Sequence, residues 1–242
     1  MPIRKIQFKK NEFYHIFNRG NGKENIFLDD KDRYRFFQSM FLSNNRNSFV
    51  GISALEKNKN KHTFEELKEI LKDNKISYDP LVCITASCLM PDHFHFLLQE
   101  KKKKGISTFM QKLGNSYGKY FAKKYDRPGS LFAGRFKARH IKNDFQLSYI
   151  IAYINAVNPA QIEEPFLKIK GVENFSKVWE RIDSYPWSTH QEFLNRRKNI
   201  LFDMELAGKI FPTAKIYFEF IKEIAQGKRK DFWNEIKDLE ID

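Results

Sequence analysis

The stretch from Leu81 to Gln99 reads LVCITASCLMPDHFHFLLQ and decides the fold of this chain. It joins a continuous apolar run, typical of a buried strand, through the turn Met90-Pro91-Asp92 to a second strand that begins at His93. Successive side chains of a strand point to opposite faces, so His93 and His95 share one face while Phe94 points into the other layer. Two imidazoles on one face of a strand can bind a single divalent metal ion.

Two other interpretations of the histidine pair stay open at this point. The histidines could be partly buried side chains whose hydrogen bonds are satisfied within the protein. They could also form a zinc site with Cys83 and Cys88, the 2 cysteines of the chain, although these lack the CxxC spacing that zinc sites usually show.

Hydrophobic periodicity predicts seven elements, in the order strand, helix, strand, strand, helix, strand, helix. They are Glu12–Arg19, Asp30–Ser43, Leu81–Leu89, His93–Gln99, Gly105–Tyr125, Arg135–Ile141 and Asp144 to about Val157. The first six form an α+β, ferredoxin-like βαββαβ arrangement, in which an antiparallel sheet has its helices on one face. This topology predicts that the histidine strand lies beside the first strand, in the middle of the sheet.

We divide the chain into a core over residues 1–160 and a helical C-terminal region over residues 161–242. The core is interrupted by a polar segment over residues 44–79, which we interpret as an insertion. Within that segment, Thr63 and Glu66 form the capping-box pattern that opens a short helix.

The composition favours an anionic partner. The 242 residues include 43 Lys and Arg against 30 Asp and Glu, a formal net charge of +13, which suits nucleic acid. The 24 Phe and 10 Tyr are mostly core residues, but aromatics between basic residues can also stack on unpaired bases. The N-terminus has no apolar signal region, and no apolar run reaches the ~20 residues that a membrane span needs. We therefore expect a cytoplasmic protein without membrane contact.

The predicted helix from Asp144 to Val157, with the residue that follows it, carries tyrosines and asparagines. Tyr153 and Tyr149 are candidate nucleophiles, because a tyrosine near a metal-bound phosphodiester can attack phosphorus and form a covalent phosphotyrosine. Asn158 and Asn155 offer amide oxygens, which can complete the ligand set of Mg²⁺ or Mn²⁺ beside two imidazoles.

Six short motifs, in order along residues 12 to about 195, resemble those of one family. The family is the HUH single-strand DNA transposases with one catalytic tyrosine, and within it the REP-associated tyrosine transposases, which carry a transposase IS200-like domain. The motifs are Tyr14-His15-Ile16-Phe17-Asn18-Arg19-Gly20, Met90-Pro91-Asp92-His93-Phe94-His95, Phe109-Met110-Gln111-Lys112-Leu113, Gly129-Ser130-Leu131-Phe132-Ala133-Gly134-Arg135-Phe136-Lys137, Tyr153-Ile154 with Asn158-Pro159, and Tyr185-Pro186-Trp187-Ser188.

The resemblance implies an HUH-endonuclease fold with an added catalytic helix and C-terminal helices. It also implies an enzyme that binds DNA hairpins, cleaves single-stranded DNA beside them and holds the 5′ end on tyrosine for strand transfer in DNA transposition. Carried over to this sequence, His93 and His95 would be ligands of a Mg²⁺ or Mn²⁺ ion and Tyr153 the catalytic nucleophile. Asn158 is the third ligand that we predict, with water or Asn155 as alternatives.

The spacing of tyrosine and asparagine departs from the pattern of the family. Relatives usually place them four residues apart, one helical turn, whereas Tyr153 and Asn158 are five apart. A local π-type bulge would restore the facing geometry. Asp144 opens the helix at the distance from the tyrosine that the family shows, which favours Tyr153 over Tyr149.

Basic side chains near the predicted sheet are candidates for contact with the DNA backbone. They are Arg19, Lys101, Lys102, Lys103, Lys104, Arg135, Lys137 and Arg139. The four lysines directly follow the histidine strand, and alternation predicts that the last three candidates share one face of their strand. Both groups could equally be solvated basic surfaces. We interpret His15 as an ordinary strand histidine.

Two other functions stay open. The chain could bind structured nucleic acid without cutting it, or it could be a metal-dependent phosphodiester hydrolase that activates water and forms no covalent adduct. The expected partner is single-stranded or hairpin DNA. A homodimer is compatible with the resemblance, because relatives build the site within one chain or share it between two.

Overall fold

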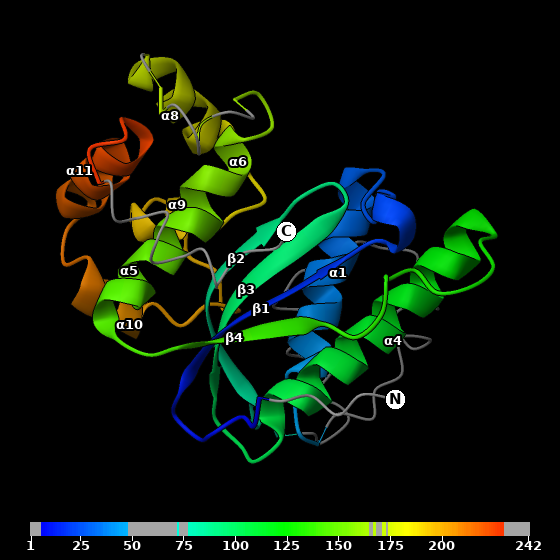
Figure 1. Ribbon diagram of the computed structural model, residues 1–242. Helices are drawn as coiled ribbons and strands as arrows, with labels where there is room; N and C mark the ends of the chain where they lie inside the picture. The colour runs from blue at the N-terminus through cyan, green and yellow to red at the C-terminus, as the bar shows by residue number, and fades with distance from the viewer. Residues whose placement is uncertain are drawn as a thin grey trace.

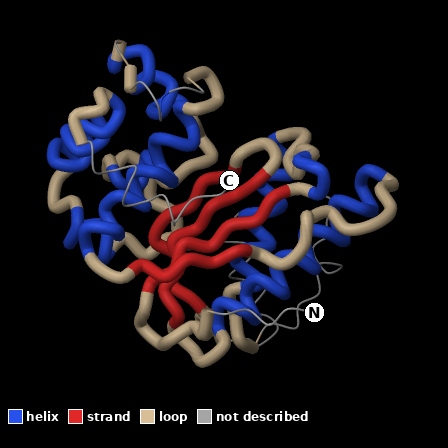
Figure 2. Tube along the Cα trace, viewed as in Figure 1, coloured by secondary structure: helices blue, strands red, loops and turns tan. Residues whose placement is uncertain are grey.

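Four strands form one antiparallel sheet in the order β2-β3-β1-β4 (Figures 1 and 2). The computed structural model describes residues 6–47, 72, 77–164, 167, 171–172 and 174–229. The strands are β1 (Phe13–Arg19), β2 (Val82–Leu89), β3 (His93–Glu100) and β4 (Lys137–Ile141). The histidine strand β3 lies beside β1 in the middle of the sheet, so the predicted ferredoxin-like topology is confirmed.

Helices α1 (Asp30–Ser43) and α4 (Gly105–Tyr125) cover one face of the sheet (Figure 1). The ring of Phe36 on α1 lies 5.2 Å from that of Phe94 and 6.2 Å from that of Phe96, measured between centroids. The phenylalanines of β3 therefore face these helices, and the histidines between them face the opposite layer.

That opposite layer contains the helices of the C-terminal half. They are α5 (Asp144–Ala152), the π-helical turn η2 (Tyr153–Val157), α6 (Asn158–Ala160), α8 (Phe175–Ser184), α9 (His190–Phe193), α10 (Glu205–Ile210) and α11 (Ala214–Ala225), and a short 3-10 turn η1 (Asn21–Lys23) follows β1. Among the described residues, no helix combines the length and apolar character needed to cross a lipid bilayer.

A buried carboxylate joins α1 to α4. Asp32 in the first turn of α1 accepts hydrogen bonds from the hydroxyls of Tyr120 and Tyr125, at 3.0 and 2.8 Å, and from Nζ of Lys124 at 2.7 Å. It also forms a capping box with Asp29, which begins the helix. Because these partners satisfy its charge, Asp32 can lie fully buried at the interface of the two helices.

Strand β4 begins two residues later than predicted. The prediction of a strand from Arg135 is wrong, because β4 pairs with β1 only from Lys137 onward. Gly134, immediately before Arg135, has a φ of +148°, a backbone angle that favours glycine and turns the chain away from the extended conformation. Arg135 therefore does not share the strand face of Lys137 and Arg139.

The two ends of the predicted insertion over residues 44–79 meet beside β2. The side chain of Asn44 makes two hydrogen bonds of 2.9 Å with the backbone of Val82, and Asn45 accepts one from the amide of Asp79 at 3.1 Å. A segment whose ends meet in this way can vary in length without displacing the sheet. The capping box predicted at Thr63 and Glu66 lies outside the described residues, and the division at residue 160 stays a prediction.

Candidate active site

The histidine face of the sheet is built by the pairing of β1 with β3. His95 pairs with Phe17 and His93 pairs with Arg19, so these four side chains lie on one face. His95 is fully buried, whereas the side chain of His93 is 13% exposed. The site is therefore more open at the end where β3 begins.

His15 contacts the histidine pair directly. Its Nε2 atom lies 2.9 Å from Nδ1 of His95, and its side chain is as deeply buried as that of His95. The sequence interpretation of His15 as an ordinary strand histidine misses this contact, because His15 pairs with Leu97 and reaches His95 along the diagonal of the two strands.

His93 is oriented by a carboxylate. Its Nδ1 atom lies 2.5 Å from Oδ1 of Asp92, whose other oxygen is 3.2 Å from Nε of Arg19. Burial alone would raise the pKa of Asp92, but the hydrogen bond and charge of His93 and the charge of Arg19 hold it below its ordinary value. Both imidazoles of the pair thus have Nδ1 engaged by a neighbouring side chain, as in metal sites whose ligands are fixed by outer hydrogen bonds.

The extra residue in the predicted helix forms a π-turn. Residues Tyr153–Val157 adopt a π-helical conformation, and the amide of Asn158 donates to the carbonyl of Tyr153, five residues earlier. The two residues are therefore separated by one turn despite the longer spacing. The π-type bulge considered from the sequence is confirmed.

Tyr153 faces the histidines and Tyr149 does not. The ring of Tyr153 is perpendicular to that of His95, with centroids 5.4 Å apart, and lies 6.0 Å from that of His15. Tyr149 instead packs between Phe145 and Phe220, at 4.3 and 5.5 Å, within the helical layer. Of the two candidate nucleophiles, only Tyr153 lies against the histidine face.

Asn155 and Asn158 have different surroundings. Oδ1 of Asn155 accepts a hydrogen bond of 2.6 Å from the hydroxyl of Thr189, so this oxygen is already engaged. Asn158 is buried, and the amide nitrogens of both residues have no hydrogen-bond partner among the described residues. Because a metal ion binds the amide oxygen, and that of Asn155 is engaged by Thr189, Asn158 is the better candidate of the two.

Neither cysteine completes a zinc site with the histidines. Among the described residues, no three His, Cys, Asp or Glu side chains gather in a way that could hold a metal, so a third protein ligand would come from another residue type, such as the amide of Asn158. The thiol of Cys83 donates to Asp203 at 3.1 Å, and that of Cys88 lies 3.7 Å from the sulfur of Met90. Burial raises the pKa of Cys83 to about 12, which disfavours the thiolate that zinc would need.

The predicted DNA-binding residues fall into separate groups. Arg19 lies within the histidine site, and Lys137 and Arg139 are exposed on β4, paired with Phe17 and His15 of β1. The four lysines lie at the end of β3 opposite to His93, roughly 25 Å along the strand at ~3.3 Å per residue. Their contact with DNA stays a prediction, and a position beside the histidines is ruled out.

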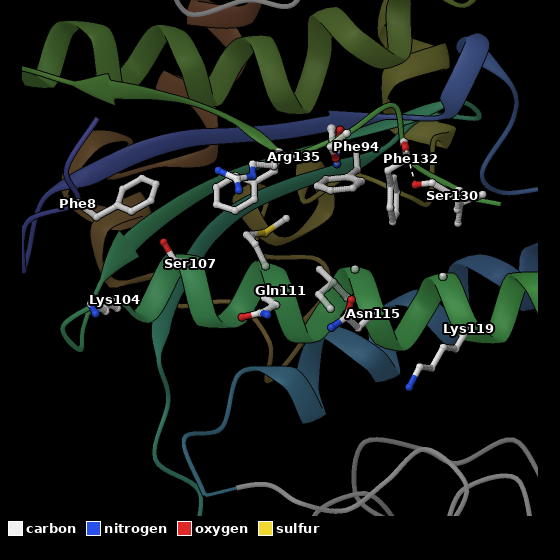
Figure 3. A pocket seen from close by; sticks show the side chains of 18 of the residues that line it. Phe8, Phe94, Lys104, Ser107, Gln111, Asn115, Lys119, Ser130, Phe132 and Arg135 are labelled. Carbon is white, nitrogen blue, oxygen red and sulfur yellow. Dashed lines mark hydrogen bonds between the residues drawn. The ribbon is translucent and has the colours of Figure 1, made fainter. Parts of the chain in front are cut away.

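A groove of about 1020 Å³ runs between α4 and the loop that leads into β4 (Figure 3). Figure 3 shows polar side chains along α4 on one side, with Arg135 and the aromatic ring of Phe132 on the other. Basic residues among its lining are Lys103, Lys104, Lys119 and Arg135. The lining acid Glu100 is buried and accepts from the first amides of α4, at 3.2 and 2.9 Å.

Comparison with known proteins identifies what this arrangement resembles. A family model described as transposase IS200-like matches residues 37–157, half of the chain, and this span includes His93, His95 and Tyr153. No curated protein matches the sequence. A solved structure described as a REP-associated tyrosine transposase bound to a REP hairpin aligns with 85% of this chain and 96% of its own, at 13% sequence identity and a TM-score of 0.48.

Proposed function

Since this chain belongs to the family of IS200-like transposases, we propose that it cleaves single-stranded DNA beside a hairpin, holds the 5′ end on Tyr153 and transfers it to another strand. The π-turn carries this proposal, because it directs the ring of Tyr153 at the buried imidazole of His95. A hydroxyl nucleophile beside two imidazoles that could hold a metal ion suits metal-assisted covalent phosphoryl transfer.

His93 and His95 would hold a Mg²⁺ or Mn²⁺ ion through their Nε2 atoms, because Asp92 and His15 engage their Nδ1 atoms. Asn158 would supply the third ligand. When bound, such an ion polarises a non-bridging oxygen of the phosphodiester. Arg19 neutralises Asp92, so the site presents no net negative charge to an incoming phosphate.

In the cleavage step, the phenolic oxygen of Tyr153 bonds to phosphorus as the bond from phosphorus to the 3′ oxygen breaks. Tyr153 loses its proton, and the leaving 3′ oxygen takes one. A free 3′ hydroxyl can reverse the same exchange, so the strand is rejoined without a nucleotide cofactor. Because Tyr153 is 3% exposed, we expect the phosphate to enter at the more open His93 end.

Basic residues extend from the groove around the β4 edge toward the histidine face. Arg135 lines the groove, and Lys137 and Arg139 continue along β4, the edge strand next to β1. Cations in a row suit a sugar-phosphate backbone, and Phe132 and Phe8 offer rings on which unpaired bases can stack. We propose that the DNA strand follows this surface.

The test is an incubation of the protein with a labelled DNA hairpin carrying single-stranded flanks and Mn²⁺, with and without a chelator. We expect a covalent protein–DNA adduct on a denaturing gel, lost on chelation and in Tyr153→Phe. Tyr149→Phe is the matched control, since that tyrosine lies on the same helix but faces the C-terminal layer; its adduct should persist.

Other outcomes of this assay identify the other functions. Cleavage without an adduct would indicate a hydrolase that activates water, and retention of the hairpin without cleavage would indicate a binding protein. An adduct that persists in Tyr153→Phe would contradict the assignment of the nucleophile.

A further inference from the structure

A buried hydrogen bond ties the π-turn to a distant part of the chain. The hydroxyl of Thr189 donates to Oδ1 of Asn155 at 2.6 Å, and both side chains are fully buried. Asn155 is the middle residue of the π-turn, and Thr189 lies 34 positions later, beyond the residues matched by the family model.

Thr189 is itself fixed to the edge of the sheet. Its amide donates to the carbonyl of Ser87 at 3.0 Å, and its hydroxyl accepts from the amide of Ser87 at 3.1 Å. The neighbouring residue Ser188 forms a β-bridge with Cys88. The segment around Thr189 thus covers the free edge of β2, and the hydroxyl of Thr189 connects that edge to η2.

Asn155 and Tyr153 point to different sides of the helix. Residues two apart on a helix do not share a face. The hydrogen bond to Asn155 on one side of the turn therefore fixes the rotation of the turn, and with it the direction of Tyr153 on the other side. A π-turn is a rarely adopted conformation and needs support from its surroundings. The Thr189 hydroxyl supplies a directional bond at the centre of this turn.

We propose that Thr189 and Asn155 are positioning residues, which hold the π-turn in the rotation that aims Tyr153 at His95. Neither touches the DNA in this role. The change in adduct rate expected from this role rests on the proposed function, whereas the expected change in hydrogen exchange does not. In this role a residue beyond Val157, where the family match ends, positions the nucleophile.

The test compares Thr189→Val, which keeps the shape and loses the hydroxyl, with Thr189→Ser, which keeps the hydroxyl. With folded protein and saturating hairpin DNA, we expect Thr189→Val to slow single-turnover adduct formation at least ~10-fold, since small misplacements of a nucleophile have large effects on rate. Hairpin affinity should change less than about twofold, and Thr189→Ser should restore most of the rate. Hydrogen exchange of the amides over residues 153–158 should speed up in Thr189→Val without DNA or metal.

Thr213→Val is the matched control for general loss of stability. Thr213 caps α11 by accepting from the amide of Ile216 at 3.2 Å and makes no hydrogen bond with the π-turn within the part of the chain that the structure describes. Its adduct rate and its exchange over residues 153–158 should match those of the unaltered protein. Asn155→Ala, alone and combined with Thr189→Val, gives a second measure, because a true pair loses no more in the double variant than in either single one.

An unchanged adduct rate and unchanged exchange in Thr189→Val would overturn the positioning role. So would equal losses in Thr213→Val. Failure of the unaltered protein to form any adduct would overturn the proposed function instead, and the exchange measurement would still decide whether Thr189 holds the turn.

Discussion

Nε2 of His15 lies 2.9 Å from Nδ1 of His95, and both rings are fully buried. At this distance one imidazole nitrogen donates to the other, which holds the ring plane of His95; when Nδ1 of His95 is the donor, its Nε2 atom keeps a lone pair for a metal ion. An outer partner of this kind prepares Nε2 of His95 for a metal ion before the ion arrives.

We expect His15→Phe to weaken Mn²⁺ binding about 10- to 100-fold, the usual effect of losing an outer hydrogen bond to a ligand. Calorimetric titration with Mn²⁺ measures it. His140→Phe is the control, because His140 pairs with Tyr14 on the opposite face of the sheet and should leave the affinity unchanged. Equal affinity in His15→Phe and the unaltered protein would refute the role of His15.

His190 should lower the stability of the fold at acidic pH. Burial lowers the pKa of His190 to about 4, although Asp183 acts in the opposite direction, and Nδ1 lies 2.9 Å from the hydroxyl of Tyr217. The unfolded chain binds the proton near pH 6.5, so the stability that His190 contributes is present above that pH and is lost as the pH falls toward 4. We expect the protein to be about 2 kcal/mol less stable at about pH 5 than at about pH 7.5 from this group.

Urea unfolding at both pH values tests this expectation. His190→Phe should be less stable at the higher pH, since the hydroxyl of Tyr217 loses its partner. The variant should nevertheless lose less stability between the two pH values than the unaltered protein does. An identical pH dependence in both proteins would show that other groups cause the acid sensitivity.

The sequence predicts those parts of the fold that rest on local pattern. Helices α1 and α4 begin and end where the apolar periodicity begins and ends, and β3 starts at His93 because the turn Met90-Pro91-Asp92 precedes it. The choice of Tyr153 over Tyr149 comes instead from the resemblance to the family, through the distance of the tyrosine from Asp144.

The rest of the site depends on contacts between distant residues. The role of His15 follows from the register of β1 against β3, and that of Thr189 from a segment that returns to the β2 edge. From the sequence, a π-turn is one of several explanations for the longer spacing of Tyr153 and Asn158. Whether the chain adopts this turn depends on contacts such as the hydrogen bond from Thr189 to Asn155. Hydrophobic periodicity cannot predict such contacts, because they join residues that come together only when the chain has folded.

The four lysines after β3 should differ in their effect on DNA binding. Lys103 and Lys104 line the groove, whereas Lys102 forms a 2.7 Å ion pair with Asp79 and the charge of Lys101 acts on Asp203. We expect the double change of Lys103 and Lys104 to Gln to lower the slope of log affinity against log salt by about 1 to 2, one phosphate contact or two.

The same change at Lys101 and Lys102 is the control, because it removes the same net charge as the change at Lys103 and Lys104. Fluorescence anisotropy of a labelled hairpin at several salt concentrations gives both slopes. Slopes lowered equally in the two double variants would mean that the lysines act through net charge and not through the groove.

Filling the groove should block DNA without harming the fold. Gly118 lies on the groove side of α4, and a Cβ atom added there meets no heavy atom within 4 Å, so Gly118→Leu has room and gains helix propensity. We expect hairpin affinity to fall at least ~10-fold, about 1.4 kcal/mol, while the midpoint of thermal unfolding stays equal or rises. Gly208→Leu on α10 is the matched control, since its added Cβ is equally unobstructed and lies outside the groove. Anisotropy titrations of both variants decide the matter: full affinity in Gly118→Leu would place the DNA elsewhere on the basic surface.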